Sequence, residues 1–301
     1  AQWIADPRNP LTARVLVNRL WQHHFGKALV RTPNNFGFLA DPPTHPELLD
    51  WLAAEFVARG ESVKALHKLI LTSQTWRQSS LHPEAADYAE EDPANRLWWR
   101  AERRRLDAES LRDSMLAATG ELDLTQGGPS FKASVSPAAL EGLSQKSAAW
   151  QASPPETQNR RSVYIYLKRG LLPPMMTAFD LCDATQPVGQ RNVTSVPTQA
   201  LVLLNNRFVH DRSHFLANRI ADELEDSVAR IRRAWDAILR RPPTAFELRL
   251  AGEHLATQTA SFQNSREPEH RIQPQGERAH RLALASLCHV LFNSNEFIYV
   301  D

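Results

Sequence analysis

The stretch NPLTARVLVNRLWQHHFG, residues 9–26, decides the fold class. Asn9 followed by Pro10 favours a helix start, because the Asn side chain can accept from a free backbone N–H and proline loses no hydrogen bond at the first helical position. Apolar residues then recur every three or four positions, as on one face of an α-helix. Gly26 predicts the end, since glycine readily adopts the left-handed conformation that closes a helix. The stretch therefore predicts a helix over about 10–25.

Similar amphipathic patterns recur along the chain, and each predicts a further helix. Capping boxes, in which a Thr hydroxyl and a Glu carboxylate bond each other's backbone N–H groups, are expected at 44–47 and at 244–247. The first begins a helix ending near Gly60 and the second a helix reaching toward Phe262. Other helices are expected over about 62–70, 95–119, 197–204, 208–224, 226–240 and 277–292. Residues 120–159 are rich in Gly, Ser, Pro, Gln and Ala and are expected to form a long loop.

The best strand candidate is Ser162–Leu167, whose sequence SVYIYL is rich in β-branched and aromatic residues. It could pair with a short strand inside the preceding loop. The expected fold is mainly α, a multi-helix bundle architecture with a small β element near residues 162–167. Its expected parts are an N-terminal helical part over 1–120, a long irregular connection over 121–161, and a C-terminal helical part with the short strand over 162–301. Together they are expected to form one continuous domain.

Composition places the chain among folded globular proteins. Of its 301 residues 42% are hydrophobic, and its eight tryptophans and twelve phenylalanines need burial. Its apolar runs are too short to span a bilayer, and residues 1–10 lack the basic start and apolar stretch of a signal peptide. Because an initiator Met is also missing, we expect a piece of a longer protein. The formal charge of +1 argues against a protein-wide attraction for nucleic acid.

The arginines and cysteines leave alternatives open. There are 29 Arg against 6 Lys. Arg binds carboxylate, sulfate and phosphate through two parallel bonds, which Lys cannot do, but an Arg excess also reflects a GC-rich genome. Cys182 and Cys288 show no metal-type spacing, and they are either two buried thiols or one long-range disulfide. Neither a haem-attachment CxxCH motif nor a phosphate-binding Gly-rich loop occurs, so no cofactor is expected in this chain.

Several long stretches of the chain resemble one bacterial family. They are 9–37 (NPLTARVLVNRLWQHHFGKALVRTPNNFG), 41–53 (DPPTHPELLDWLA), 160–180 (RRSVYIYLKRGLLPPMMTAFD), 189–206 (GQRNVTSVPTQALVLLNN) and 291–301 (LFNSNEFIYVD). They resemble the planctomycete domain of unknown function 1553, with similarity from about Trp3 to Asp301. The resemblance implies the C-terminal part of a large exported protein, in which a cytochrome-c-like domain and a second domain of unknown function commonly precede it. It also implies a periplasmic or extracellular location, where a Cys182–Cys288 disulfide is chemically permissible. The family carries no established activity and assigns no catalytic residue.

The most distinctive polar stretch is 189–199, GQRNVTSVPTQ, between two elements that are expected to pack. Side chains able to bind an anion or a sugar hydroxyl there are Arg191, Asn192, Thr194 and Gln199. Alternatively, they satisfy the backbone of their own loop and cap the next helix. Asp180 could pair with Arg191 or Arg161 and act as a general base. We favour a fixed ion pair, because a nearby Arg lowers the pKa of a carboxylate and makes it a poorer base.

Other candidate sites each have a simpler structural interpretation. His210 and His214 are spaced like two metal ligands on one helical face, but the HExxH glutamate is missing and no third ligand follows from spacing, so no metal is assigned. The Arg clusters at 103–105 and 230–241 could bind phosphate or sulfate, yet the first has acidic partners one helical turn away. Trp98-Trp99 could stack on a sugar or a base, although one of two adjacent residues is expected in the core.

Three functions are consistent with these residues. We expect a non-catalytic interaction module of an exported multidomain protein, which binds other domains of its parent, among them a haem domain, because no catalytic motif indicates an enzyme. The second hypothesis is an enzyme or binding domain for acidic or sulfated polysaccharide, with a site lined by Arg161, Asp180, Arg191 and Asn192. The third is nucleic-acid binding through the Arg clusters, which the nearly neutral charge disfavours.

Overall fold

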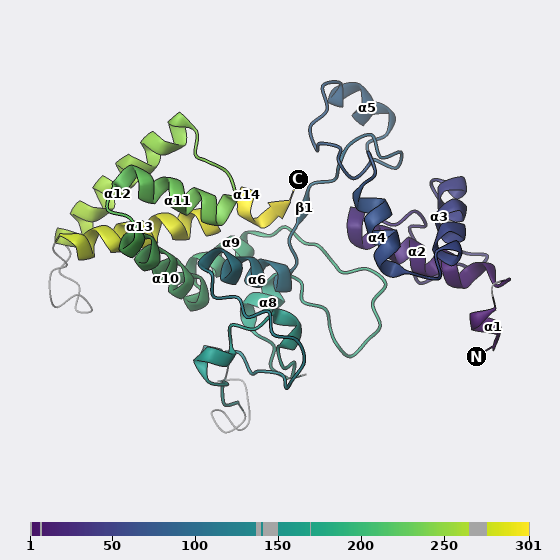
Figure 1. The fold of residues 1–301 in the computed structure, drawn as a ribbon, viewed down its shortest axis with the longest axis horizontal. Helices are drawn as coiled ribbons and strands as arrows, with labels where there is room; N and C mark the ends of the chain where they lie inside the picture. Colours follow the sequence, from purple (N-terminus) through teal and green to yellow (C-terminus); the bar gives the residue numbers. More distant parts are fainter. Residues whose placement is uncertain are drawn as a thin grey trace. The chain divides into compact units, whose positions relative to one another are not determined.

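The computed structural model describes residues 2–6, 8–136, 140, 150–168, 170–264 and 276–300. Helices dominate it, so the expected mainly α fold is confirmed (Figure 1). The chain divides into two compact units. Unit 1 runs to Arg104 and includes Val188–Gln190, and unit 2 covers Arg105–Pro187 and Arg191–Val300. Every helix in the described ranges is too short or too polar to cross a membrane.

Unit 1 is built on α2 and α3, which pack on each other and on α4. The helices of unit 1 are α1 (Gln2–Ala5), α2 (Pro10–Phe25), α3 (Pro46–Ala58), α4 (Val63–Leu71) and α5 (Ala85–Glu91). The predicted ends of α2 are confirmed: the Asn9 side chain accepts from Leu11 N, and Gly26 closes the helix with φ 79°. The Ser62 side chain caps α4, close to the start expected for this helix. These helices enclose an apolar core that includes Trp21, Leu52, Leu66 and Trp98.

The start of α3 differs from the prediction. α3 begins at Pro46 with His45 at the N-cap position, and no side chain caps it, so the capping box expected from Thr44 and Glu47 is wrong. Proline disfavours helical φ and ψ in the residue before it, so His45 stays outside the helix, with φ −137° and ψ 84°, and Thr44 is one residue too early to cap it. The Thr44 N–H donates instead to Leu29 O at 3.0 Å, which ties this residue to the preceding loop.

The long helix expected over 95–119 is present only in its second half. α6 (Ala108–Thr119) begins after Asp107, whose side chain caps it. Before this point Asn95 and Trp98 have φ values of 49° and 58°, which a right-handed helix excludes. α6 packs against α8 and α10 and therefore belongs to unit 2, whereas the sequence places the limit of the N-terminal helical part near residue 120.

Unit 2 is organised around α13, which packs against α10, α11 and α12. The helical segments of unit 2 are α6, η2 (Pro155–Thr157), η3 (Ser162–Tyr164), α8 (Pro174–Ala178), α9 (Pro197–Asn205), α10 (Arg207–Glu223), α11 (Ser227–Leu239), α12 (Ala245–Asn264), α13 (Glu277–Phe292) and α14 (Asn295–Ile298). The side chains of Leu284, Cys288 and Phe292 on α13 are fully buried among the residues of this core.

The β structure is small. β1 (Arg104–Arg105) pairs with β2 (Tyr299–Val300) in a two-stranded sheet. The continuous strand expected near 162–167 does not form, because Ser162–Tyr164 is a 3-10 turn whose first residue is held by the Asp113 carboxylate. A single bridge joins Ile165 to Phe131, so the expected pairing with the preceding loop is present at one residue.

The capping box expected at Thr244 is confirmed at the start of α12. Thr244 N donates to Glu247 Oε2 at 2.7 Å, and Glu247 N donates to Thr244 Oγ1 at 3.2 Å. We expect Thr244→Ala to lower the free energy of unfolding of unit 2 by about 1 kcal/mol, because one N–H of the first turn loses its acceptor. Urea denaturation followed by circular dichroism measures this loss. Thr257→Ala, at an exposed position within α12, is the matched control, and an equal loss in both variants would contradict the role of the cap.

Candidate functional site

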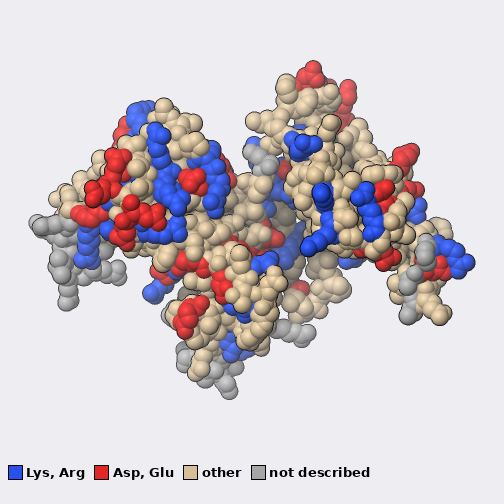
Figure 2. Space-filling view, viewed as in Figure 1, with Lys and Arg blue, Asp and Glu red and all other residues tan. Residues whose placement is uncertain are grey.

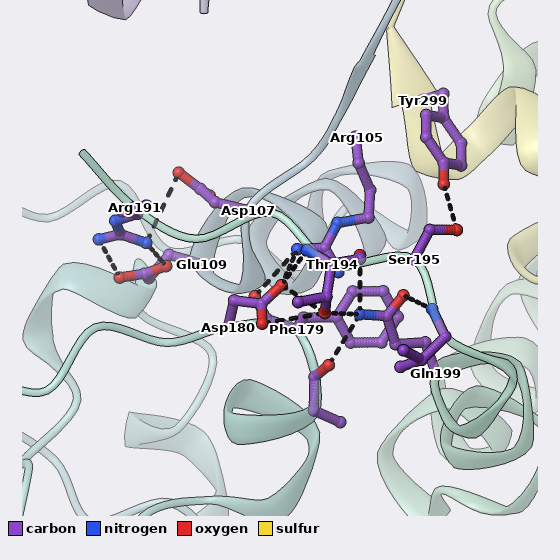
Figure 3. A network of polar contacts seen from close by, with 12 residues as sticks. Arg105, Asp107, Glu109, Phe179, Asp180, Arg191, Thr194, Ser195, Gln199 and Tyr299 are labelled. Carbon is purple, nitrogen blue, oxygen red and sulfur yellow. Dashed lines mark hydrogen bonds and ion pairs between the residues drawn. The ribbon is translucent and has the colours of Figure 1, made fainter.

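Three of the predicted site residues lie together in a polar network of unit 2 (Figure 3). Asp180 follows α8 and has a φ of 59°, a left-handed conformation that Asp tolerates better than most residues. Thr194 lies in the exposed, irregular segment before α9, and Gln199 lies in the first turn of α9. Asp180, at the beginning of the segment between α8 and α9, and Thr194, near its end, are therefore in direct contact.

Asp180 is the acceptor at the centre of the network. Its carboxylate accepts from Thr194 N at 2.8 Å, from Thr194 Oγ1 at 3.0 Å and from Arg105 Nη2 at 2.7 Å. The Arg105 side chain is only 3% exposed and lies over the ring of Phe179. Partial burial alone would raise the pKa of Asp180, but the hydrogen bonds from Thr194 and the charge of Arg105 outweigh it and hold the pKa below its ordinary value.

This geometry gives Asp180 the role of a fixed anion. A general base must be free to take a proton near neutral pH, and a carboxylate with a lowered pKa and three donors is a poor one. The preferred interpretation as an ion pair is therefore consistent with the structure. The expected partners Arg191 and Arg161 are wrong, since Arg105 occupies that position.

Arg191 contacts a different carboxylate. Its Nη1 and Nη2 donate to the two oxygens of Glu109 at 2.6 and 2.8 Å, and Asp107 lies 3.8 Å away. Hydrogen bonding to Glu109 raises the pKa of the Arg191 guanidinium above its ordinary value. Both acids belong to the start of α6, where the helix dipole favours negative charge. The anion that Arg191 was expected to bind is thus supplied by the chain itself.

Gln199 closes the network toward the backbone. Its Nε2 donates to Ala178 O at 3.0 Å and to Thr194 O at 3.1 Å, and its Oε1 accepts from Val196 N at 3.4 Å. The side chain is buried in spite of the exposed residues before it. Gln199 and Thr194 therefore satisfy the backbone of their own loop, as in the alternative interpretation of this stretch.

Asn192 and Arg161 are not part of this network. Both residues are exposed, and within the part of the chain that the structure describes neither side chain makes a hydrogen bond or ion pair with Asp180 or Arg191. Their proposed contacts with a ligand stay predictions.

The histidines contact a helix end. His210 and His289 stack with ring centroids 4.2 Å apart, and their Nε2 atoms lie 2.9 Å from Leu204 O and 3.3 Å from Leu203 O. Burial lowers the pKa of His214 and His289, and the charge of His210 acts in the same direction. No group of three or more His, Cys, Asp or Glu side chains in the described ranges is placed to hold a metal ion. His210 and His289 thus meet the last carbonyls of α9.

Several arginines of the two clusters are engaged within the protein. In the first cluster, Arg104 donates to His23 O and Arg105 pairs with Asp180. Arg230 is buried and bonds Glu277 at 2.9 Å, and Arg241 pairs with Glu247 and Glu296. On the face visible in Figure 2, basic and acidic side chains are intermingled over each unit. A binding surface for nucleic acid needs a one-sided basic field, which such pairing weakens.

Sequence reasoning missed Arg112 as a buried contact. This side chain of α6 is 5% exposed and donates to Arg160 O at 3.0 Å, to Ser162 Oγ at 3.2 Å and to Gln158 O. Burial lowers its pKa to about 10, although the nearby Asp113 opposes this. A helical wheel could have found it, because position 112 falls on the apolar face of α6.

The remaining candidates are the two cysteines and the Trp98-Trp99 pair. Cys182 and Cys288 are free thiols, so the permissible disulfide is not formed, and burial raises the pKa of Cys288 to about 12. Trp98 is buried in the core of unit 1 as expected for one of the pair. Trp99 stacks on Tyr88, and Arg100 lies over its ring at 5.0 Å, so neighbours already cover this platform.

A family model matches most of the chain. It is described as "PSD1: Protein of unknown function (DUF1553)" and covers residues 1–255, which include unit 1 up to Arg104 and the polar network of unit 2. No curated protein and no solved structure matches the chain. The description of the family assigns no reaction, substrate or partner.

Proposed function

This chain belongs to the DUF1553 family of proteins of unknown function, and from that premise we propose that it is a non-catalytic interaction module of an exported multidomain bacterial protein. The module would work in the periplasm or outside the cell. It would hold another domain of its parent protein, for which a haem domain is the first candidate.

An exposed apolar face on and just before α9 carries this proposal. Val193 and Val196 before the helix are 67% and 42% exposed, and Leu201 and Leu204 on it are 57% and 46% exposed. Only Gln199 and Leu203 of α9 are buried. Exposed aliphatic side chains one helical turn apart offer a partner an apolar contact, which is the usual centre of a protein–protein interface.

The polar network next to this face favours binding over catalysis. Its one central carboxylate, Asp180, is ionised and held by Arg105, and Arg191 is paired with Glu109. A polysaccharide-cleaving site needs an acid and a base free to exchange protons with substrate. This network instead anchors the start of α9, since the Gln199 side chain donates a hydrogen bond to Ala178 O.

Isothermal titration calorimetry tests the proposal. The chain is titrated with each other domain of its parent protein, expressed separately, and we expect one of them to bind with a dissociation constant of about 1–100 µM. A variant with Leu201→Asp and Leu204→Asp should weaken this binding at least about tenfold, because charge replaces the apolar contact. Val228→Asp, an exposed apolar position on α11, is the matched control and should bind as the native chain does.

Three outcomes speak against the proposal. The absence of binding to every other domain removes it. New reducing ends from sulfated or uronic oligosaccharides incubated with the chain would establish an enzyme. DNA retention that falls steeply with salt would support the Arg clusters as the binding surface.

A further inference from the structure

Two histidines join the last turn of α2 to α4 in unit 1. His24 Nε2 and His67 Nδ1 lie 2.7 Å apart, and the two rings meet edge to face with centroids 4.9 Å apart. Both side chains are half-buried. Trp76, in the segment just after α4, packs against His24 with ring centroids 5.4 Å apart. The pair therefore holds α4 and the segment after it on the end of α2.

The bond between the two rings depends on their protonation. A hydrogen bond between two imidazoles requires that one of the facing nitrogens carries a proton and that the other does not. This condition is met when both rings are neutral and also when only one ring is protonated. When both rings are protonated, both facing nitrogens carry a hydrogen. The bond is then lost, and two positive charges face each other.

The charges that act on His24 oppose its protonation. Arg104 lies over the ring of Trp76 and donates to His23 O, so its guanidinium is close to this end of α2. Burial lowers the pKa of His24, and the charges of His67, Arg104 and His23 act in the same direction. The closed form of unit 1 therefore binds a proton here less readily than a form in which α2 and α4 have separated.

The acids on the neighbouring helix do not offset this effect. α3 packs on both α2 and α4, but its Asp50 pairs with Arg14 and its Glu55 pairs with Arg59. In the part of unit 1 that the structure describes, no carboxylate bonds either ring, and no negative charge acts on His24. The other charged residues of these helices and of the segment after α4 are Arg19, Glu47, Lys64, Lys68 and Arg77.

α4 has few other contacts that oppose its release. It has nine residues, of which only Leu66 and Ile70 are buried. Few buried apolar contacts are typical of elements that open locally at a low cost in free energy. Release of α4 uncovers these two side chains and gives unit 1 an apolar surface that the closed form does not show.

We propose that the His24–His67 pair is an acid-sensitive latch, which holds α4 on α2 while at least one ring is neutral and releases α4 when both rings are protonated. Because the open form binds more protons, the hold is complete above the ordinary pKa of histidine, about 6.5, and is lost as the pH falls below that value. Each additional proton favours the open form by up to about tenfold per pH unit. The latch concerns unit 1 alone and does not depend on the partner proposed for α9.

Hydrogen exchange of the whole chain, followed by mass spectrometry, tests the latch. The protection of the α4 amides is compared at about pH 7.5 and about pH 5.5, after correction for the intrinsic exchange rate at each pH. We expect this protection to fall at least about tenfold at the lower pH. The amides of α6 in unit 2, a helix without histidine, are the internal reference and should change less than about twofold.

Two variants keep the bond but remove one titrating ring. His67→Asn places an amide at the position of Nδ1, and its oxygen can accept from His24 even when His24 is protonated. His24→Gln places an amide at the position of Nε2 in the same way. In both variants α4 should stay protected at about pH 5.5. His45→Gln removes another half-buried histidine of unit 1, and this matched control should lose protection of α4 as the native chain does.

Three results would overturn the inference. The first is a native chain in which α4 is equally protected at both pH values. The second is a loss of protection in His67→Asn and His24→Gln as large as in the native chain, since another group would then be responsible. The third is an equal loss in α4 and α6, which would mean that the whole chain unfolds and that no local latch opens.

Discussion

Arg112→Met is expected to lower the free energy of unfolding of unit 2 by about 3–5 kcal/mol. The guanidinium is buried and donates to Arg160 O, Ser162 Oγ and Gln158 O, which come from one irregular segment. Methionine keeps most of the volume of the side chain but has no donor, so these buried acceptors lose a partner. Guanidinium chloride denaturation followed by tryptophan fluorescence measures the loss.

Two further variants separate this effect from a general effect of removing an arginine. Arg207→Met removes a side chain that is 93% exposed and lies 3.7 Å from Asp211, and it should change stability by less than about 0.5 kcal/mol. Arg112→Lys keeps a positive charge but cannot reach separate acceptors with a planar fork, and we expect an intermediate loss. If Arg112→Met were as stable as the native chain, the segment would not depend on this contact.

Phe292→Ala is expected to cost about 3–5 kcal/mol of stability in unit 2. The ring is fully buried on α13 and meets Phe297 edge to face, with centroids 5.1 Å apart. Alanine leaves a cavity in a core that cannot collapse easily, because α13 is held by helices on several sides. The measurement is the denaturant midpoint, compared at equal slope with that of the native chain.

Val290→Ala is the matched control for this prediction. It lies on the same helix two residues earlier but is 53% exposed, so the loss should be below about 1 kcal/mol. Similar losses at both positions would mean that helix propensity, and not burial, decides stability at this end of α13.

Features set by neighbouring residues could be predicted from the sequence. Asn9, Ser62, Asp226 and Thr244 all cap the helices expected to follow them, because a cap is a bond between groups two or three residues apart. The recurrence of apolar residues every three or four positions also predicted α13 correctly, because this pattern likewise depends on residues close in the sequence.

The helix predicted over 95–119 does not form in its first half, because a side-chain bond to the backbone and a contact with the core of unit 1 outweigh helix propensity there. The Asp92 carboxylate accepts from Arg96 N and Leu97 N, which holds these residues in a turn. Trp98 then enters the core of unit 1, so the chain must leave a helical path to place it. Neither contact is visible as a period in the sequence.

The candidate site was likewise predictable only in the contacts between residues close in the sequence. Thr194 and Gln199 were predicted to act together because they belong to one polar stretch, 189–199. Asp180 was linked to that stretch through Arg191, whereas its contact there is with Thr194. The choice of Arg105 as the partner of Asp180 could not be predicted, since 75 residues separate them and 29 arginines are available. Which of them meets a given carboxylate depends on how α6 and the segment before it are placed.

The order of the two units along the chain has a consequence for the nascent protein. The core of unit 1 lies between Val17 and Trp98, so its apolar residues emerge together when the chain leaves the ribosome N-terminus first. The core of unit 2 cannot form until α13 has emerged, because α10, α11 and α12, which pack against α13, all precede it in the chain. Until α13 has emerged, the apolar faces of α10, α11 and α12 are exposed and can make non-native contacts. Chaperone assistance should therefore matter most during that interval.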